Sequence, residues 1–255
     1  MKKAWRPIGS PLARIRMGFG TRPLSYEWGN DRGLEIARYY LENRFFPEFA
    51  ADIRGRTLEF GSDMYASRFG DTTRLSKIDV LNLEDGIPGT TIRADLTKPN
   101  GIPDNTFDCI ISTHVLHLVK DFNAACDDMH RILKPGGVLM VAVPHASMCD
   151  PSWGEYWRFT RLGVQAVMER TFDHGDVTMR AYGNSLTAAG EIRGLCAHEF
   201  TRRELDYHDH RFAVEICARA EKRGLQGSAP TQHHYENETD CQQSKRSAAG
   251  PQQPS

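Results

Sequence analysis

The chain has 255 residues, of which 40% are hydrophobic and 25% are charged, and its formal net charge is -1 at pH 7. This composition supports a folded core and excludes a globally disordered chain. A nearly neutral chain without a basic stripe argues against a nucleic-acid-binding protein. Because no apolar run reaches the length of about 20 residues that crosses a bilayer, and the basic N-terminus lacks an apolar signal core, the sequence predicts a cytoplasmic protein without a membrane segment.

The cysteines point to the same compartment. No two of them stand at the spacing of a CxxC pair, and their neighbours are mostly apolar. This pattern predicts buried free thiols in a reducing environment. The six residues are Cys109, Cys126, Cys149, Cys196, Cys217 and Cys241.

The N-terminal part of the chain divides into an arm and a helix. Residues 1–30 contain several prolines and glycines and predict an irregular arm. Apolar residues recur at helical spacing over 33–45, with Asp31 as a candidate N-cap and Pro47 as a stop or kink.

From Arg56 onward, short apolar runs alternate with helical stretches. Asp121 is the predicted N-cap of the helix over 121–133, with the "KPGG" segment as its terminator, and Thr160 is the predicted cap of the helix over 160–172. A further helix is expected over 185–199, and the polar tail 227–255 is expected to be disordered. The predicted strands are 56–60, 75–83, 90–96, 108–112, 138–144, 175–183 and 210–221.

Strands that alternate with helices predict an α/β fold with a parallel sheet. The parallel run ends in a pair of strands joined by the helix over 185–199, and such a pair suggests one reversed strand. The sequence therefore predicts a Rossmann-like, doubly wound sheet of about seven strands, mostly parallel, with helices on both faces. The domain is expected over 31–226, between the arm and the tail.

Polar groups follow the predicted strands in order. Ligands of open α/β sheets bind at the carboxyl ends of the strands. Glu59 ends the first strand, and Gly61 follows where the backbone must approach a ligand closely. Asp79 lies about twenty residues later, at the expected tip of the second strand, where an acid can accept hydrogen bonds from a ribose diol. Asp95 follows the third strand and suits an adenine amino group. Leu96 and Thr113 complete the candidate cofactor pocket.

These segments resemble a class I S-adenosylmethionine-dependent methyltransferase. The run from "DNTFDCIIS" to "RILKPGGVL" carries the most specific likeness, and "WGNDRG", "ARYY", "YWRFT", "AYGN" and "ELDYHD" resemble a bacterial branch found with glycosyltransferases and surface-polysaccharide genes. The resemblance implies S-adenosylmethionine as cofactor, a small-molecule or glycan acceptor and an association with glycosyltransferases. The family's G-x-G-x-G loop is reduced here to Gly61, followed by Tyr65 and Phe69-Gly70, which indicates an altered loop.

Methyl transfer from a sulfonium needs alignment of acceptor, methyl and sulfur, and a base only where a hydroxyl must lose its proton. His114 is the first candidate base and His145 the second, whereas His117 is expected to be structural. Tyr156 and Arg158 are candidate acceptor contacts, although "GEYWRFT" could equally anchor the following helix.

Three alternatives compete with a methyltransferase acting at oxygen. A module of the same fold could serve without catalysis as an interaction subunit of a glycan-assembly complex. A nicotinamide dehydrogenase is disfavoured because the chain lacks G-x-G-x-x-G. A zinc site at "ELDYHDH" is disfavoured because alternate residues diverge and no third ligand stands nearby at the required spacing, so no metal is expected.

Overall fold

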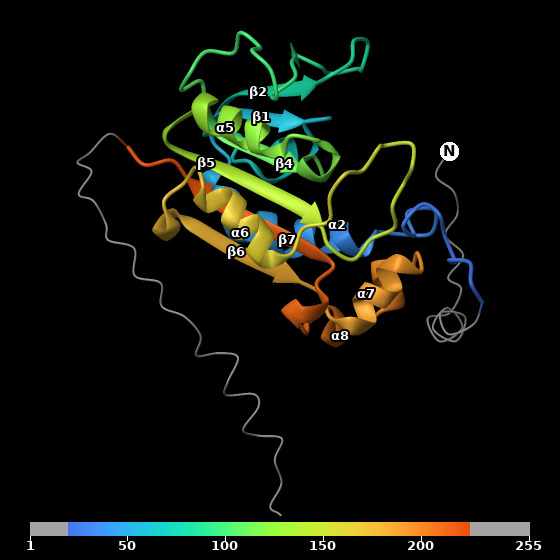
Figure 1. Cartoon of the computed structure of the whole chain (residues 1–255). Coiled ribbons are helices and arrows are strands. Elements are labelled where there is room, and N and C mark those ends of the chain that lie inside the picture. Colours follow the sequence, from blue (N-terminus) through green and yellow to red (C-terminus); the bar gives the residue numbers. More distant parts are fainter. Residues whose placement is uncertain (1–19, 225–255) are drawn as a thin grey trace, which may run out of the picture. The chain divides into compact units, whose positions relative to one another are not determined.

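A seven-stranded sheet in the order β3-β2-β1-β4-β5-β7-β6 forms the centre of the computed structural model, which describes residues 20–224 (Figure 1). β1 lies in the middle and pairs in parallel with β2 and β4, and β5 pairs in parallel with β4. β7 runs antiparallel to both of its neighbours. The predicted sheet with one reversed strand is therefore confirmed. The strands are β1 Gly55–Phe60, β2 Leu75–Asn82, β3 Ile92–Arg93, β4 Phe107–Thr113, β5 Leu133–Pro144, β6 Val177–Tyr182 and β7 Glu215–Glu221.

Helices cover both faces of this sheet, as the sequence predicts. α5 and α6 lie on one face and pack with apolar side chains of the strands into one buried cluster, whereas α2 lies on the other face (Figure 1). Burial of both faces explains why the central strands are nearly continuous apolar runs. The α-helices are α2 Ile36–Tyr40, α3 Phe46–Phe49, α4 Met64–Phe69, α5 Phe122–Ile132, α6 Arg161–Glu169, α7 Ser185–Ile192 and α8 Arg202–Asp206. The 3-10 turns are Ala50–Asp52, Leu116–Leu118, His174–Asp176, Ala197–Glu199 and His210–Phe212.

Two of the predicted helix caps are confirmed. The Asp121 carboxylate accepts a hydrogen bond from the Ala124 amide, and the Thr160 hydroxyl accepts one from the Gly163 amide. Each cap satisfies one amide that the first helical turn leaves unpaired, typically stabilising the fold by about 1 kcal/mol.

The first helix differs from its prediction. Asp31 is not its N-cap, because the helix begins at Ile36 without a side-chain cap and Asp31 accepts a hydrogen bond from Ser25 Oγ at 2.6 Å. α2 is followed by a π-helical turn, Leu41–Phe45, and then by α3, which contains Pro47 and ends at Phe49. Pro47 therefore does not stop the helical segment. Pro47 is accommodated because it lies in the first turn of α3, where a missing amide costs little.

Two other boundaries differ. The "KPGG" segment, 134–137, does not form a loop but lies within β5, which begins directly after α5. The predicted helix over 185–199 ends at Ile192. Gly194 explains that end: its φ is +70°, and a Cβ there would lie 2.3 Å from the Ser25 carbonyl oxygen.

The predicted arm and tail lie largely outside the described residues. Residues 20–30 of the arm contact the domain, through a hydrogen bond from the Leu24 amide to the Arg193 carbonyl and one from Trp28 Nε1 to Ser147 Oγ. Residues 1–19 and the predicted tail, 227–255, are not described. Within 20–224, none of the helices has the length and apolar character needed to span a membrane.

The prediction for the cysteines holds at four positions and is wrong at one. Cys109, Cys126, Cys196 and Cys217 are free and buried, whereas Cys149 is free and exposed. Cys149 lies in the loop after β5, outside the apolar strands and helices that bury the others. Cys241 lies outside the described residues.

Candidate functional site at the carboxyl ends of the strands

A cavity of about 770 Å³ opens where the central strands end. Its walls are mainly apolar and come from the ends of β1 and β2, the segment after β3, the segment after β4 and α5. This is the edge of the sheet where the fold binds ligands. The lining residues include Phe60, Leu81, Leu83, Ala94, Asp95, Leu96, Val115, Leu116, Val119, Phe122, Met129, Tyr156 and Trp157.

The turn after β1 is tied down by the strand's own acid. Glu59 is buried, and its carboxylate accepts hydrogen bonds from the Tyr65 and Ala66 amides at 3.0 and 2.7 Å, at the start of α4. Burial raises the pKa of Glu59 to about 7 despite these two bonds. Gly61 has a φ of +80°, and a Cβ there would meet nothing within 4 Å. The turn therefore needs glycine for its conformation and leaves open space beside the backbone.

The prediction that Asp79 marks the tip of the second strand is wrong. β2 continues to Asn82, and Asp79 pairs with Leu58 in the body of the sheet. Its buried carboxylate accepts hydrogen bonds from Arg56 and Thr91 and pairs with Lys77 at 2.6 Å. Burial alone would raise the pKa of Asp79, but these partners lower it. Asn82 occupies the tip instead, and its amide donates to Thr90 Oγ1 at 2.8 Å.

Asp95 and Leu96 lie where the sequence predicts, on the wall of the cavity after β3. The Asp95 carboxylate accepts hydrogen bonds from the Thr97 amide and hydroxyl and pairs with Lys98 at 2.7 Å. The hydrogen bond from Lys98 is the largest of the influences that lower the pKa of Asp95 to about 2. Asp95 is therefore an ionised acceptor throughout the neutral range.

Thr113 is the last residue of β4, and its side-chain hydroxyl has an unsatisfied hydrogen-bonding capacity. Its Oγ1 is buried and has no hydrogen-bond partner, and the same holds for Ser112 Oγ on the opposite face of the strand. A buried hydroxyl without a partner costs free energy, and a bound polar ligand atom can repay it. The cavity, the open turn at Gly61, the ionised acceptor Asp95 and the unpaired Thr113 hydroxyl all lie at the carboxyl ends of the central strands.

His114, whose side chain is 33% exposed, pairs with a buried residue that is distant in the sequence. Its Nε2 lies 3.0 Å from Oε1 of Glu215, which is fully buried at the start of β7. Burial lowers the pKa of His114, but the charge and hydrogen bond of Glu215 outweigh burial and raise it. His114 also has a φ of +53°, a conformation that costs energy outside glycine and that clusters at functional sites. With Nε2 held by a carboxylate, Nδ1 is the nitrogen left to accept a proton.

The other two histidines are held by the loop after β5. His117 is buried, its carbonyl accepts hydrogen bonds from the Tyr156 and Trp157 amides, and burial lowers its pKa to about 3. His145 Nδ1 lies 2.7 Å from the Phe159 carbonyl oxygen, so that nitrogen carries the proton. His117 thus has the structural role that the sequence suggests, and the structure gives His145 no acidic partner comparable to Glu215.

Tyr156 and Arg158 have different surroundings. Tyr156 is 57% exposed and lines the cavity next to Trp157, whose ring packs edge-to-face on Phe122. Arg158 pairs with Glu155 and donates to the Met148 carbonyl oxygen at 3.0 Å. Arg158 therefore organises its own loop, while the aromatic side chains form the mouth of the cavity.

Glu215 is the site residue that sequence reasoning missed. It lies 101 positions after His114, so no local spacing connects them. A signal is nevertheless present, because "FAVEICARA" places a single acid inside an apolar strand. Charged side chains are rarely buried without a partner, so such an acid predicts a partner elsewhere in the fold.

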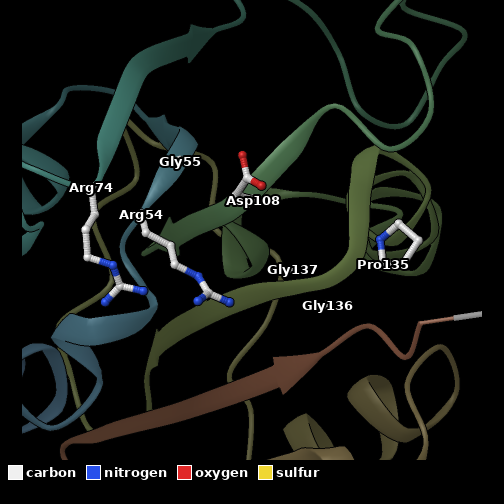
Figure 2. Close-up of a pocket in the computed structure, with 7 residues that line it drawn as sticks. All are labelled: Arg54, Gly55, Arg74, Asp108, Pro135, Gly136 and Gly137. Atoms are coloured by element: carbon white, nitrogen blue, oxygen red, sulfur yellow. The ribbon is translucent and has the colours of Figure 1, made fainter.

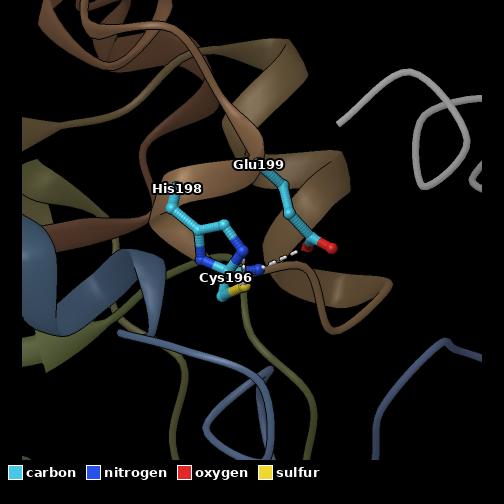
Figure 3. Close-up of side chains that lie close together, drawn as sticks. All are labelled: Cys196, His198 and Glu199. Carbon is cyan, nitrogen blue, oxygen red and sulfur yellow. Dashed lines mark hydrogen bonds between the residues drawn. The ribbon is translucent and has the colours of Figure 1, made fainter. Parts of the chain in front are cut away.

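Two other places hold side chains of chemical interest. A second cavity, of about 510 Å³, lies at the amino ends of β1, β4 and β5 (Figure 2). Cys196, His198 and Glu199 offer ligand atoms within 4.8 Å of one another (Figure 3). The Glu199 carboxylate is already engaged by Arg32 and the Cys196 amide at 3.1 and 2.9 Å. A carboxylate neutralised in this way is a poor metal ligand, so this trio reads as a structural turn.

Part of the sequence is similar to a known protein family. Residues 73–141, from just before β2 into β5, match the model of the methyltransferase domain family. The human mitochondrial arginine-hydroxylase NDUFAF5 is 31% identical over 121 residues, which cover 48% of this chain and 28% of that protein. The ubiquinone/menaquinone biosynthesis C-methyltransferase UbiE of Pasteurella multocida is 47% identical over 49 residues, or 19% of this chain and 18% of that protein.

A SAM-dependent methyltransferase from Archaeoglobus fulgidus superposes with a TM-score of 0.47 and 11% identity, covering 73% of this chain and 92% of that one. The chain spans less than a third of the length of the two curated relatives above. The matched family segment contains Asp95, Leu96, Thr113 and His114, all placed at the carboxyl edge of the sheet. Residues 73–141 are therefore similar to the methyltransferase domain family over about a quarter of the chain.

Proposed function

We propose that the protein transfers a methyl group from S-adenosylmethionine to a hydroxyl of a small-molecule or glycan acceptor. The observation that carries this proposal is the methyltransferase-domain match, whose segment supplies the cavity wall and the His114 side of the His114–Glu215 pair. Oxygen is the proposed acceptor atom because a histidine paired with a buried carboxylate can accept the proton of a hydroxyl.

In this proposal the residues at the carboxyl ends of the central strands would hold the cofactor. Asp95 and Leu96, which line the cavity, would hold its adenine part. The open turn at Gly61 and the unpaired Thr113 hydroxyl would serve its amino-acid end. Glu59 acts indirectly, because its carboxylate fixes the turn and α4, and Asp79 fixes β2 through Arg56 and Lys77.

When bound, S-adenosylmethionine supplies a methyl group on a positively charged sulfur. The role of His114 Nδ1 would be to accept the proton that the acceptor hydroxyl must lose when it is methylated. Glu215 holds Nε2 and stabilises the imidazolium that results. The protein's remaining task is alignment, which the rigid strand ends provide. His145 is the second candidate for the same role.

The aromatic mouth supports a ring-shaped acceptor. Tyr156 and Trp157 are 57% and 40% exposed beside the cavity, and flat aromatic faces stack well on the apolar face of a sugar. A glycan acceptor and an association with glycosyltransferases belong to this proposal. Arg158 contributes by holding the loop that carries these rings.

The test is turnover with a panel of hydroxyl acceptors, including sugar nucleotides and free glycans, read as formation of S-adenosylhomocysteine. His114→Asn should lower kcat by about 100-fold or more, as expected for loss of a general base, while cofactor affinity stays within a factor of about three. His145→Asn serves as the comparison. A larger loss of kcat in His145→Asn would assign the base to His145. Turnover equal to that of the wild type in both variants would refute a histidine base.

A second candidate is a domain that binds without methylating. It is favoured by the reduced glycine loop and by one relative whose name gives a hydroxylase activity. Saturable cofactor binding with no turnover on any acceptor would favour this candidate.

A further inference from the structure

We propose that the cavity at the amino ends of the strands binds a small phosphorylated molecule. Its lining residues are Arg54, Gly55, Arg74, Asp108, Pro135, Gly136 and Gly137. They come from the starts of β1, β4 and β5 and from the residue before β2 (Figure 2). The methyl-transfer site lies at the opposite ends of the same strands, so this is a separate site.

Two arginines give the cavity its positive charge. Arg54 and Arg74 are exposed, and neither side chain has a hydrogen bond or ion pair to another described residue. Most other arginines in residues 20–224 are paired with carboxylates, as Arg131, Arg180 and Arg219 are. Unpaired guanidinium groups that converge on one cavity are suited to an external anion, and a planar guanidinium binds phosphate through two parallel hydrogen bonds.

The acid in the cavity does not cancel this charge. The Asp108 carboxylate accepts hydrogen bonds from the Arg56 amide at 2.8 Å and from Lys134 Nζ at 2.7 Å. Asp108 and Lys134 neutralise each other, so the two free arginines leave the cavity with a net positive charge. Figure 2 shows both guanidinium groups extending away from Asp108.

The backbone beneath Asp108 fits only glycine. Gly55 has a φ of +61°, and a Cβ there would lie 2.4 Å from the Asp108 carboxylate. Gly55 therefore allows Asp108 to sit directly over the chain, where it is held by Lys134 and Arg56. This arrangement fixes the position of Asp108 in the cavity wall.

Size and charge identify the class of ligand. A cavity of about 510 Å³ is within the range of small-molecule sites. A nucleic acid would need a basic surface of greater extent, and the chain as a whole has a net charge of -1. A phosphate or diphosphate group held by two arginines would satisfy the charge, and the cavity has room for the rest of a small phosphorylated molecule.

The test is calorimetric titration of inorganic phosphate and pyrophosphate into the full chain, with and without saturating S-adenosylhomocysteine. Arg54→Gln and Arg74→Gln are each expected to weaken pyrophosphate binding by about tenfold, and the double variant by about 100-fold. The matched control is the double variant Arg161→Gln, Arg203→Gln, which removes the same charge from exposed positions outside the cavity.

The proposal predicts one saturable pyrophosphate site that survives both S-adenosylhomocysteine and the control substitutions. It is overturned if neither probe binds saturably, or if the control variant weakens binding as much as the cavity variant. Because the result does not depend on methyl transfer, it separates this site from the proposed function.

Discussion

In the His114–Glu215 pair, His114 has a φ of +53° and Glu215 is a fully buried acid. His114 must be neutral to accept a proton, so activity should rise as the pH passes its pKa, which Glu215 raises above the ordinary histidine value. In Glu215→Gln the charge is lost, the pKa of His114 falls, and the rise should move to lower pH. The measurement is kcat against pH for both proteins.

Glu215 is a positioning residue in this account, so its kcat should also fall when the ring is no longer held. Glu221→Gln, at the other end of β7, is the matched control and should leave the pH profile unchanged. A Glu215→Gln profile that keeps the wild-type midpoint would contradict the role of the His114–Glu215 pair.

Thr113 tests the cofactor contact with a change of a single atom. Thr113→Val keeps the branched shape but removes the hydroxyl that has no partner in the described residues. Removing an unsatisfied buried group should leave the melting temperature equal or higher, while affinity for S-adenosylmethionine falls by about tenfold. Ser112→Ala removes the neighbouring unsatisfied hydroxyl and should leave affinity unchanged. Equal affinity in Thr113→Val and the wild type would remove Thr113 from the site.

At this scale the sequence predicts positions better than partners. Asp95, Leu96 and Gly61 follow strand ends and lie where expected, because strand ends can be recognised locally. Asp79 was misplaced because β2 runs on to Asn82, and the apolar residues after an acid do not reveal where a strand stops. Glu215 was missed because its contact with His114 depends on the fold of the whole domain.

At the scale of elements, the junction of β1 and α4 is sensitive to pH. Burial raises the pKa of Glu59 to about 7 from its ordinary value of 4.5, so folding favours its protonated form. That contribution to stability is complete below pH 4.5 and is lost as the pH rises through 7. The shift corresponds to roughly 3 kcal/mol.

Denaturant unfolding of the wild type and Glu59→Gln at pH 5 and pH 8 measures this effect. The glutamine does not titrate, so the wild type should lose more free energy of unfolding than the variant between the two pH values, by up to about 3 kcal/mol. Parallel losses in both proteins would contradict a raised pKa at Glu59.

Element order was predictable, whereas several boundaries were not. The apolar runs and the caps Asp121 and Thr160 identify strands and helices from local chemistry. The helix through Pro47 and the break at Gly194 depend on contacts with distant segments, such as the Ser25 backbone beside Gly194. Local patterns cannot contain that information.

At the scale of the whole molecule, cofactor binding should stabilise the fold. The candidate cofactor site draws on the ends of β1 and β2 and on the segments that follow β3 and β4, so a bound ligand would hold these segments together. At a concentration of 100 times its dissociation constant, S-adenosylmethionine should add about 2.7 kcal/mol to the free energy of unfolding. Thermal unfolding with increasing cofactor measures the shift, and a melting temperature that does not move would contradict it.

The central claim, that the carboxyl edge of the sheet is an S-adenosylmethionine site, is tested most directly by calorimetric titration of the cofactor into the full chain. NAD is the control ligand, and Thr113→Val is the variant that changes the proposed site. The account predicts one site that binds S-adenosylmethionine, is weakened in the variant and does not bind NAD. Absence of binding by S-adenosylmethionine and by S-adenosylhomocysteine would contradict the account.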